Sequence, residues 1–105
     1  MATFLRTIFT DNVAGTRGGA VSFDINDPSY TDLSLMEDCR VARNTATTGG
    51  GIDVSTLATT VAVHTTHFDD NYATDDGGAI AGSDAIITVV DSTMERNFAG
   101  KSGGG

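Results

Sequence analysis

The sequence predicts an all-β fold, a parallel β-helix of about three coils, and two observations carry this prediction. The first is an internal repeat, with a period close to 26 residues in its later copies, that spans nearly the whole chain of 105 residues. The second is a composition rich in Asp, Thr and Gly, which disfavours long helices and favours short strands joined by turns. Short strands repeated at this spacing are typical of a solenoid whose successive turns pair about 4.8 Å apart.

Four segments share the pattern apolar-x-x-Asn-x-Ala, followed shortly by Gly-Gly and a small residue. The spacings between successive Asn residues are 32, 27 and 26. One Gly-Gly pair would mean little, but four aligned copies indicate one continuous repeat segment over residues 1–105. The repeat motifs lie near residues 9–21, 41–52, 68–80 and 94–105.

Each full unit is predicted to hold three short strands. The first is an alternating run before the motif, the second ends three residues before Asn, and the third follows the Gly pair. The first runs are Leu33–Leu35, Val61–Val63 and Ile87–Val89, and the third runs are Val21–Phe23, Ile52–Val54 and Ile80–Gly82.

Equivalent positions form columns that we expect to point inward, where each coil lies on the next. The position three before Asn is large and apolar, the position two after Asn is always Ala, and the position five before Asn is small. The last column contains Cys39, which we predict to be a buried and inert thiol. The columns are Phe9, Val41, Phe68, Met94; Ala14, Ala46, Ala73, Ala99; and Thr7, Cys39, Thr66, Ser92.

The Asn and Gly columns are predicted to form two corners of the coil. Asn tolerates a left-handed backbone, and stacked Asn amides can bond one another along the stack. Gly pairs suit a corner where the backbone turns sharply or approaches a neighbour closely. The predicted structural ladder is Asn12, Asn44, Asn71 and Asn97, with Gly18, Gly19, Gly49, Gly50, Gly77 and Gly78.

The residue before each Asn alternates in charge from coil to coil. The four residues are Asp11, Arg43, Asp70 and Arg96. In register, each charge would have neighbours of opposite sign, and each exposed pair would contribute about 0.2–1 kcal/mol.

The two motifs Phe-x-x-Asn and Gly-Gly-Ala-Ile/Val resemble the repeats of the chlamydial polymorphic outer-membrane protein family and of right-handed β-helix proteins with the pectin-lyase-like fold. The matches are Phe9 to Asn12 with Gly18 to Val21, and Phe68 to Asn71 with Gly77 to Ile80. The second unit departs from the pattern at Val41 and Gly51, and the fourth has Met94 in place of Phe. The resemblance implies a right-handed β-helix in a secreted or cell-surface stalk, often an adhesive passenger segment associated with the outer membrane. Because neither end resembles a capping unit, we expect a fragment of a longer stack.

Clustered acids and two histidines are the candidate metal ligands. Asp69, Asp70, Asp75 and Asp76 flank Asn71, and convergent oxygens suit calcium, while turn chemistry and solubility are the simpler explanation. His64 and His67 stand three apart, which places them on opposite faces of a straight strand, so a zinc site would need the nearby corner and Asp69. The sequence assigns no metal site, leaving calcium as the one open cofactor.

No catalytic residue is assigned. Asp38 and Asp91 occupy equal offsets two coils apart, about 9–10 Å, a separation within the range of inverting glycosidases. A lyase would need a basic group in a calcium cleft, and Lys101 is the only lysine.

The longest insertion, residues 24–32, carries the only Pro and Tyr30, and a long loop on a rigid stack suits recognition. Tyr30 is therefore the predicted ligand contact.

Composition limits the classes of partner. A net charge of −8 argues against nucleic acid, and no apolar run is long enough to cross a bilayer. We expect a non-enzymatic structural or adhesive segment, extracellular or at the cell surface, that meets a carbohydrate or a host or cell-surface protein. A fragment of a pectin-lyase-like polysaccharide lyase or glycoside hydrolase is the alternative, and end-to-end self-association is a third interpretation.

Overall fold

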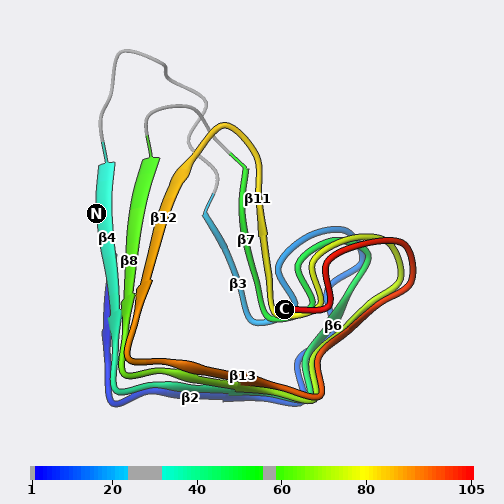
Figure 1. The fold of residues 1–105 in the computed structure, drawn as a ribbon, viewed down its shortest axis with the longest axis horizontal. Helices are drawn as coiled ribbons and strands as arrows, with labels where there is room; N and C mark the ends of the chain where they lie inside the picture. The colour runs from blue at the N-terminus through cyan, green and yellow to red at the C-terminus, as the bar shows by residue number, and fades with distance from the viewer. Residues whose placement is uncertain (1, 24–31, 56–58) are drawn as a thin grey trace.

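The chain winds into a stack of parallel coils in the computed structural model, which describes residues 2–23, 32–55 and 59–105. Equivalent segments of successive coils superimpose when the stack is viewed along its axis (Figure 1). Within the described residues there is no helix, and all strand pairs are parallel. The predicted all-β parallel β-helix is therefore confirmed.

Four sheets run along the stack, and each coil adds one strand to each sheet that it reaches. The first sheet contains β1 (Thr3–Leu5), β4 (Asp32–Glu37), β8 (Thr59–His64) and β12 (Ile86–Val90). The second contains β2 (Ile8–Thr10), β5 (Arg40–Ala42), β9 (His67–Asp69) and β13 (Thr93–Glu95). The third contains β6 (Thr45–Ala46), β10 (Tyr72–Ala73) and β14 (Phe98–Ala99), and the fourth contains β3 (Val21–Phe23), β7 (Ile52–Val54) and β11 (Ile80–Gly82).

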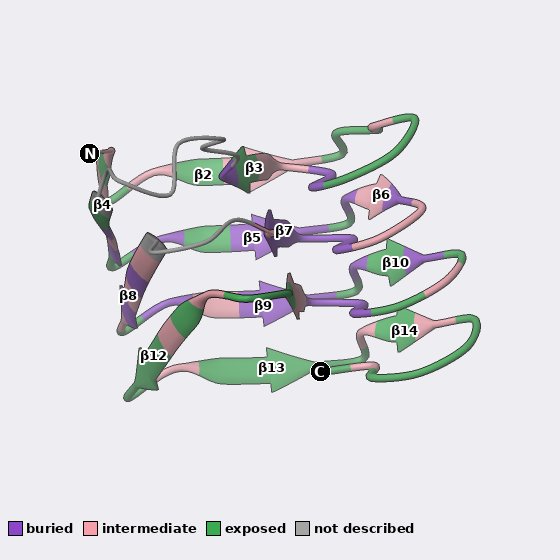
Figure 2. Ribbon diagram, turned by 90° about the horizontal axis from the view of Figure 1, so that it is seen from above, coloured by how far each residue is buried: buried purple, intermediate pink, exposed green. Residues whose placement is uncertain are grey.

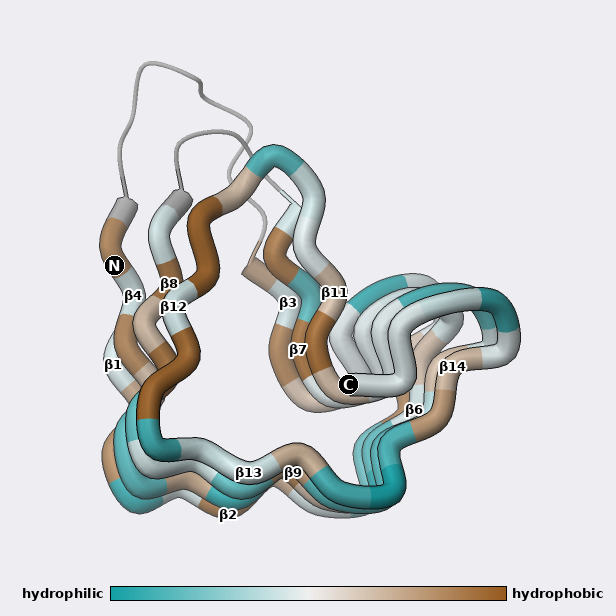
Figure 3. Tube along the Cα trace, viewed as in Figure 1, coloured by the Kyte–Doolittle hydropathy of each residue, from teal (hydrophilic) through white to brown (hydrophobic). Residues whose placement is uncertain are grey.

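The hydrophobic core lies between the first, second and fourth sheets, where the two inner coils are buried (Figure 2). Hydropathy along the chain is high on β7 and β12 and low at the corner after β13 (Figure 3). Val41 and Phe68 are fully buried, whereas Met94, their equivalent in the last coil, is 37% exposed. Burial of a column therefore depends on having a coil on both sides. The fully buried apolar side chains of the core include Met36, Val41, Ile52, Val54, Val61, Val63 and Phe68.

Residues with left-handed backbone end the strands of the first and second sheets. Their φ angles lie between 46° and 59°. The Asn column was expected to adopt this conformation, but the residue before each Asn does so instead. The left-handed residue turns the chain so that the following Asn side chain faces the coil interior. The two corners are formed by Arg6, Asp38, Thr65, Asp91 and by Asp11, Arg43, Asp70, Arg96.

The register of β4 differs from the predicted equivalence of the alternating runs. Leu33 pairs with Thr60 and Leu35 with Ala62, so both leucines lie on the outer face of the first sheet. Ser34 and Met36 are the buried residues of β4. Met36 and Val63 both lie eight residues before an Asn and pair with each other. The corner that follows β4 and β8 is the same in both coils, and it sets this register.

Two different constraints require glycine in each Gly pair. The first Gly has a left-handed backbone, with φ of 62° at Gly18 and 66° at Gly49. The second Gly lies against the next coil: a Cβ on Gly50 would be 2.5 Å from the carbonyl oxygens of Gly78 and Tyr72. Real Cβ atoms do not approach other atoms this closely, so with any side chain at position 50 the coils could not stack at their present spacing.

The substitution Gly50→Ala is expected to lower the free energy of unfolding by about 2–3 kcal/mol, because the added methyl group overpacks a backbone contact. Gly15→Ala is the matched control, since a Cβ there meets nothing within 4 Å, and its effect should stay within about 0.5 kcal/mol. Urea unfolding of both variants measures the difference. Equal effects would show that inter-coil contact does not select glycine at position 50.

Candidate functional site

An asparagine ladder runs through the stack behind the corner between the second and third sheets. The side-chain Nδ2 of Asn44 donates to Oδ1 of Asn71 at 3.0 Å, and Nδ2 of Asn71 donates to Oδ1 of Asn97 at 2.9 Å. The second hydrogen of each amide reaches back one coil: Asn44 donates to the carbonyl of Phe9, and Asn71 to the carbonyl of Val41. Each inner Asn thus links three coils.

Backbone donors fix the direction of this ladder. The main-chain N–H of Asn44 donates to Oδ1 of Asn71 at 3.0 Å, and the N–H of Asn71 donates to Oδ1 of Asn97 at the same distance. An N–H can face only an acceptor, so the oxygen of each amide must point toward the preceding coil. Asn44 and Asn71 are buried, where hydrogen bonds are strong and unpaired groups are costly.

A second polar ladder occupies the corner between the first and second sheets. Each side chain five residues before Asn donates to the carbonyl two residues earlier, for example Thr66 to His64 at 2.9 Å and Ser92 to Val90 at 2.9 Å. The hydroxyls also accept main-chain N–H groups from the preceding coil. Cys39 occupies the same column, is buried, and lies 3.3 Å from the carbonyl of Glu37. The sequence indicated only that this column is small, and the hydroxyl chemistry was not recognised.

The alternating charge column forms ion pairs between adjacent coils. Arg43 contacts Asp11 through two bonds of 2.8 and 3.0 Å. Arg96 contacts Asp70 through bonds of 3.0 and 3.3 Å. Both pairs are exposed, so each contributes little to stability by itself.

Asp69 is the most enclosed carboxylate of this surface, with 3% of its side chain exposed. Arg40 donates to both of its oxygens at 3.3 and 3.2 Å, and Arg96 approaches it at 3.7 Å. The Arg40 guanidinium holds the pKa of the Asp69 carboxyl below its ordinary value, despite the opposing effect of burial. Asp69 therefore remains charged at neutral pH.

The acids considered as calcium ligands have other partners. Asp69 and Asp70 bind arginines, Asp75 lies 3.2 Å from Nζ of Lys101, and Asp76 accepts a hydrogen bond from Ser102 at 2.7 Å. Among the described residues, no three His, Cys, Asp or Glu side chains are grouped so that they could hold a metal ion.

His64 and His67 have different surroundings. Nε2 of His67 lies 3.9 Å from Asp69, and its Nδ1 contacts the hydroxyl of Thr93 in the next coil. His64 ends β8, one corner away, and pairs with Glu37 and Val90 in the first sheet.

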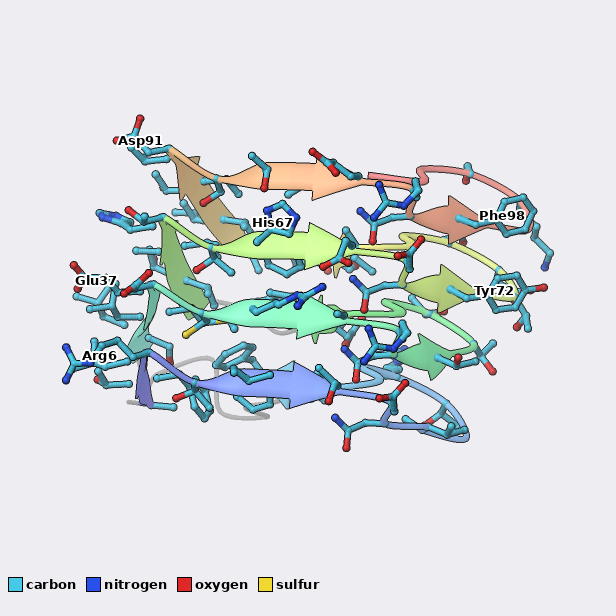
Figure 4. All side chains as sticks on the ribbon, turned by 90° about the horizontal axis from the view of Figure 1, so that it is seen from below. Arg6, Glu37, His67, Tyr72, Asp91 and Phe98 are labelled. Atoms are coloured by element: carbon cyan, nitrogen blue, oxygen red, sulfur yellow. The ribbon has the colours of Figure 1, made fainter. Side chains whose placement is uncertain are left out.

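The structure places the two candidate hydrolytic carboxylates at one corner. Asp38 and Asp91 are exposed and both have left-handed backbone, with φ of 54° and 50°. Thr65 occupies the coil between them. Figure 4 shows Asp91 at the same edge of the stack as Arg6 and Glu37.

The predicted ligand contact, Tyr30, lies outside the described residues, together with residues 24–29 and 31 of the long insertion. Another aromatic feature was missed by sequence reasoning. Tyr72 and Phe98 lie side by side on the outside of the third sheet (Figure 4), with ring centroids 5.3 Å apart and planes only 4° apart. They are 41% and 55% exposed. The signal was available, since both residues directly follow an Asn of the ladder.

The coil that holds Tyr72 is one of two segments of the chain that match a known family. The family model described as the Chlamydia polymorphic membrane protein repeat matches residues 6–24 and 65–83, about a third of the chain. The chain carries this repeat at two places. The polymorphic membrane protein repeat covers the two units with Phe and Gly-Gly-Ala, namely those of Phe9 and Phe68, as the sequence predicted. The unmatched units with Val41 and Met94 pair in the same sheet and register.

The repeat indicates a segment of a surface or outer-membrane protein. Comparison with curated proteins and with solved structures found no match. Within the described part of the chain, no helix has the length and apolar character needed to cross a membrane.

Replacing Asn71 by Ala is expected to lower the free energy of unfolding by about 2–4 kcal/mol, because the buried N–H groups of Asn44 and the carbonyl of Val41 lose their partners. Asn12→Ala, at the exposed end of the same ladder, should cost about 0.5–1 kcal/mol. Chemical denaturation of the two variants tests the difference. A cost at position 12 as large as that at position 71 would contradict the structural importance of burial along the ladder.

Substituting Arg40 by Met should destabilise the protein at pH 7 more than Arg43→Met, because Asp69 is enclosed whereas Asp11 is exposed. The folded-state pKa of Asp69 lies below its unfolded value near 3.8, so the stabilisation is fully present above about pH 4 and declines as the pH falls further. The stability difference between wild type and Arg40→Met should therefore shrink below about pH 4. Unfolding curves at pH 7, 5 and 3 measure it, and a difference independent of pH would exclude the ion pair as its cause.

Proposed function

We propose that this chain is a rigid, non-enzymatic segment of a secreted or cell-surface protein, associated with the outer membrane, that presents side chains for adhesion. The observation that supports this proposal best is the exposed aromatic pair of Tyr72 and Phe98 on the third sheet. Large apolar side chains usually lie inside a protein, and two stacked rings held at the surface by adjacent coils form a preorganised contact.

The ligand class follows from the chemistry of this pair. The exposed parts of the two rings offer apolar surface that suits the C–H groups of a sugar or an apolar side chain. Lys101 and Asp75, paired at 3.2 Å on the following loop, add polar groups near the third sheet. We therefore propose a carbohydrate or a cell-surface protein of the host as the partner.

The distribution of charges supports a non-enzymatic function. The acids around Asn71 are engaged by Arg40, Arg96, Lys101 and Ser102, so they are committed to inter-coil contacts. The alternative, a fragment of a polysaccharide lyase or hydrolase, rests on Asp38 and Asp91 at one exposed corner.

End-to-end self-association is the second partner proposal. The asparagine ladder is directional. Nδ2 of Asn12 donates to Asn44, so Oδ1 of Asn12 is the acceptor that the ladder presents at the first coil. Oδ1 of Asn97 accepts from Asn71, so Nδ2 of Asn97 is the donor that the ladder presents at the last coil. The first and last coils therefore present complementary hydrogen-bonding groups.

Binding of the fluorescently labelled chain to cultured epithelial cells and to an immobilised glycan panel tests the adhesive function. We expect the double variant Tyr72→Ala/Phe98→Ala to bind at least about tenfold more weakly, because buried aromatic anchors dominate recognition. Val13→Ala is the matched control, since Val13 is an exposed apolar residue of the same column that Thr45 separates from the stacked rings.

Two outcomes would overturn this proposal. Undiminished binding by the double variant would exclude the aromatic pair as the contact. Degradation of an acidic polysaccharide in the presence of calcium, abolished by Asp38→Asn or Asp91→Asn, would replace adhesion by the enzymatic alternative.

A further inference from the structure

The outer face of the first sheet is unusually apolar for a surface. Leu5, Leu33, Ile86 and Val90 are exposed there, at 47%, 57%, 64% and 41%. Each lies at an outward position, because its neighbours in the same strand point into the core. An apolar sheet face of this kind marks an interaction site.

The face is an ordered grid, since the strands of successive coils are paired in register. One column contains Thr3, Leu35, Ala62 and Thr88, and the next contains Leu5, Glu37, His64 and Val90. A third column contains Leu33, Thr60 and Ile86. Rows lie about 4.8 Å apart, and outward residues of one strand lie about 6.6 Å apart.

We propose that this face docks on the same face of a second copy of the chain, with the two stacks antiparallel. The twofold axis lies parallel to the strands and passes between the second and third coils. This operation reverses the order of the coils and keeps each column opposite itself. The two sheets would pack face to face, about 10 Å apart, as in a β-sandwich.

Size complementarity supports this arrangement over others. The large side chains of Leu33 and Leu35 in the second coil would face the smaller Thr60 and Ala62 of the partner's third coil. Leu5 would face Val90, and Thr3 would face Thr88. Large residues thus oppose small ones at the centre of the interface, which allows the two surfaces to interdigitate.

Charge complementarity points the same way. The carboxylate of Glu37 would face the imidazole of His64 of the second copy, which can donate a hydrogen bond to it, and the same pair would recur on the other side of the axis. Arg6 of the first coil would lie at the same edge as Asp91 of the partner's last coil. Arg6, Glu37 and Asp91 project from one edge of the stack in Figure 4. A twofold axis along the stack would instead reverse the order of the columns and bring Glu37 against Leu33 of the second copy.

The area available predicts a weak association. Strands of up to six residues and four rows give a face of roughly 400 Å² per copy, or about 800 Å² in total. This is below the size of a typical stable interface, so the dimer should be reversible and dependent on concentration.

Sedimentation equilibrium of the whole chain from about 10 µM to 1 mM tests the proposal. The expected result is a closed monomer–dimer equilibrium. Leu33→Lys should weaken dimerisation at least tenfold, while Val13→Lys, which places the same charge on an exposed valine of another face, should leave it unchanged. Circular dichroism of each variant shows that the fold is retained.

A charge exchange identifies the geometry. Arg6→Asp should weaken the dimer, and the double variant Arg6→Asp/Asp91→Arg should restore it, because these two residues lie in the first and last coils of one chain and meet only across the proposed interface. A chain that stays monomeric throughout, dimerisation insensitive to Leu33→Lys, or open-ended growth beyond the dimer would overturn the proposal. Open-ended growth that is insensitive to Leu33→Lys would support end-to-end association instead. Cell and glycan binding is a separate measurement, so the two proposals can fail independently.

Discussion

The asparagine ladder is the constraint on which the remaining structure depends. The side-chain amides of Asn44 and Asn71 form hydrogen bonds with the neighbouring Asn side chain and with a carbonyl of the preceding coil. The main-chain N–H of each donates to the side chain of the next Asn. These groups are buried, so their bonds can be formed only when successive coils are in one register. This register also aligns the residues of the apolar columns, the hydroxyl ladder and the charge column, because each lies at a fixed distance from Asn in the sequence.

The left-handed corners connect the ladder to the surface. A non-glycine residue in this conformation costs of order 1 kcal/mol, and each of the two corners before the ladder contains one in every coil. At the corner directly before Asn, the left-handed residue is charged and its side chain points to solvent, where it meets the opposite charge of a neighbouring coil. The Asp11–Arg43 and Asp70–Arg96 pairs thus arise from the same turn that directs Asn inward. This arrangement leaves the outer faces of the sheets free to carry large apolar residues such as Tyr72, Phe98 and Leu33.

Stability in such a stack is a sum over neighbouring coils. Val41 and Phe68 are fully buried because a coil lies on each side, whereas their equivalents Phe9 and Met94 are only partly covered. The same residue type therefore contributes more to the free energy of unfolding in an inner coil than in an outer one. Burial, rather than the identity of the repeat residue, decides how much each position contributes.

The sequence by itself determined the repeat, the parallel β-helix and the columns that include Asn71, Gly50 and Phe68, because a solenoid places residues of one repeat position above one another. The register of β4 was predicted wrongly because the alternating runs Leu33–Leu35 and Val61–Val63 were aligned with each other, whereas counting back eight residues from each Asn aligns Met36 with Val63. The sequence did not reveal that the residue before Asn turns the chain, or that Asp69 is enclosed by Arg40 from another coil. These features depend on contacts between residues about 26 to 32 positions apart. The sequence does place Tyr72 and Phe98 at one repeat position, but only the tertiary structure decides which side chains face solvent, and so only it showed that these two rings stack there and that Leu33 belongs to an outward grid.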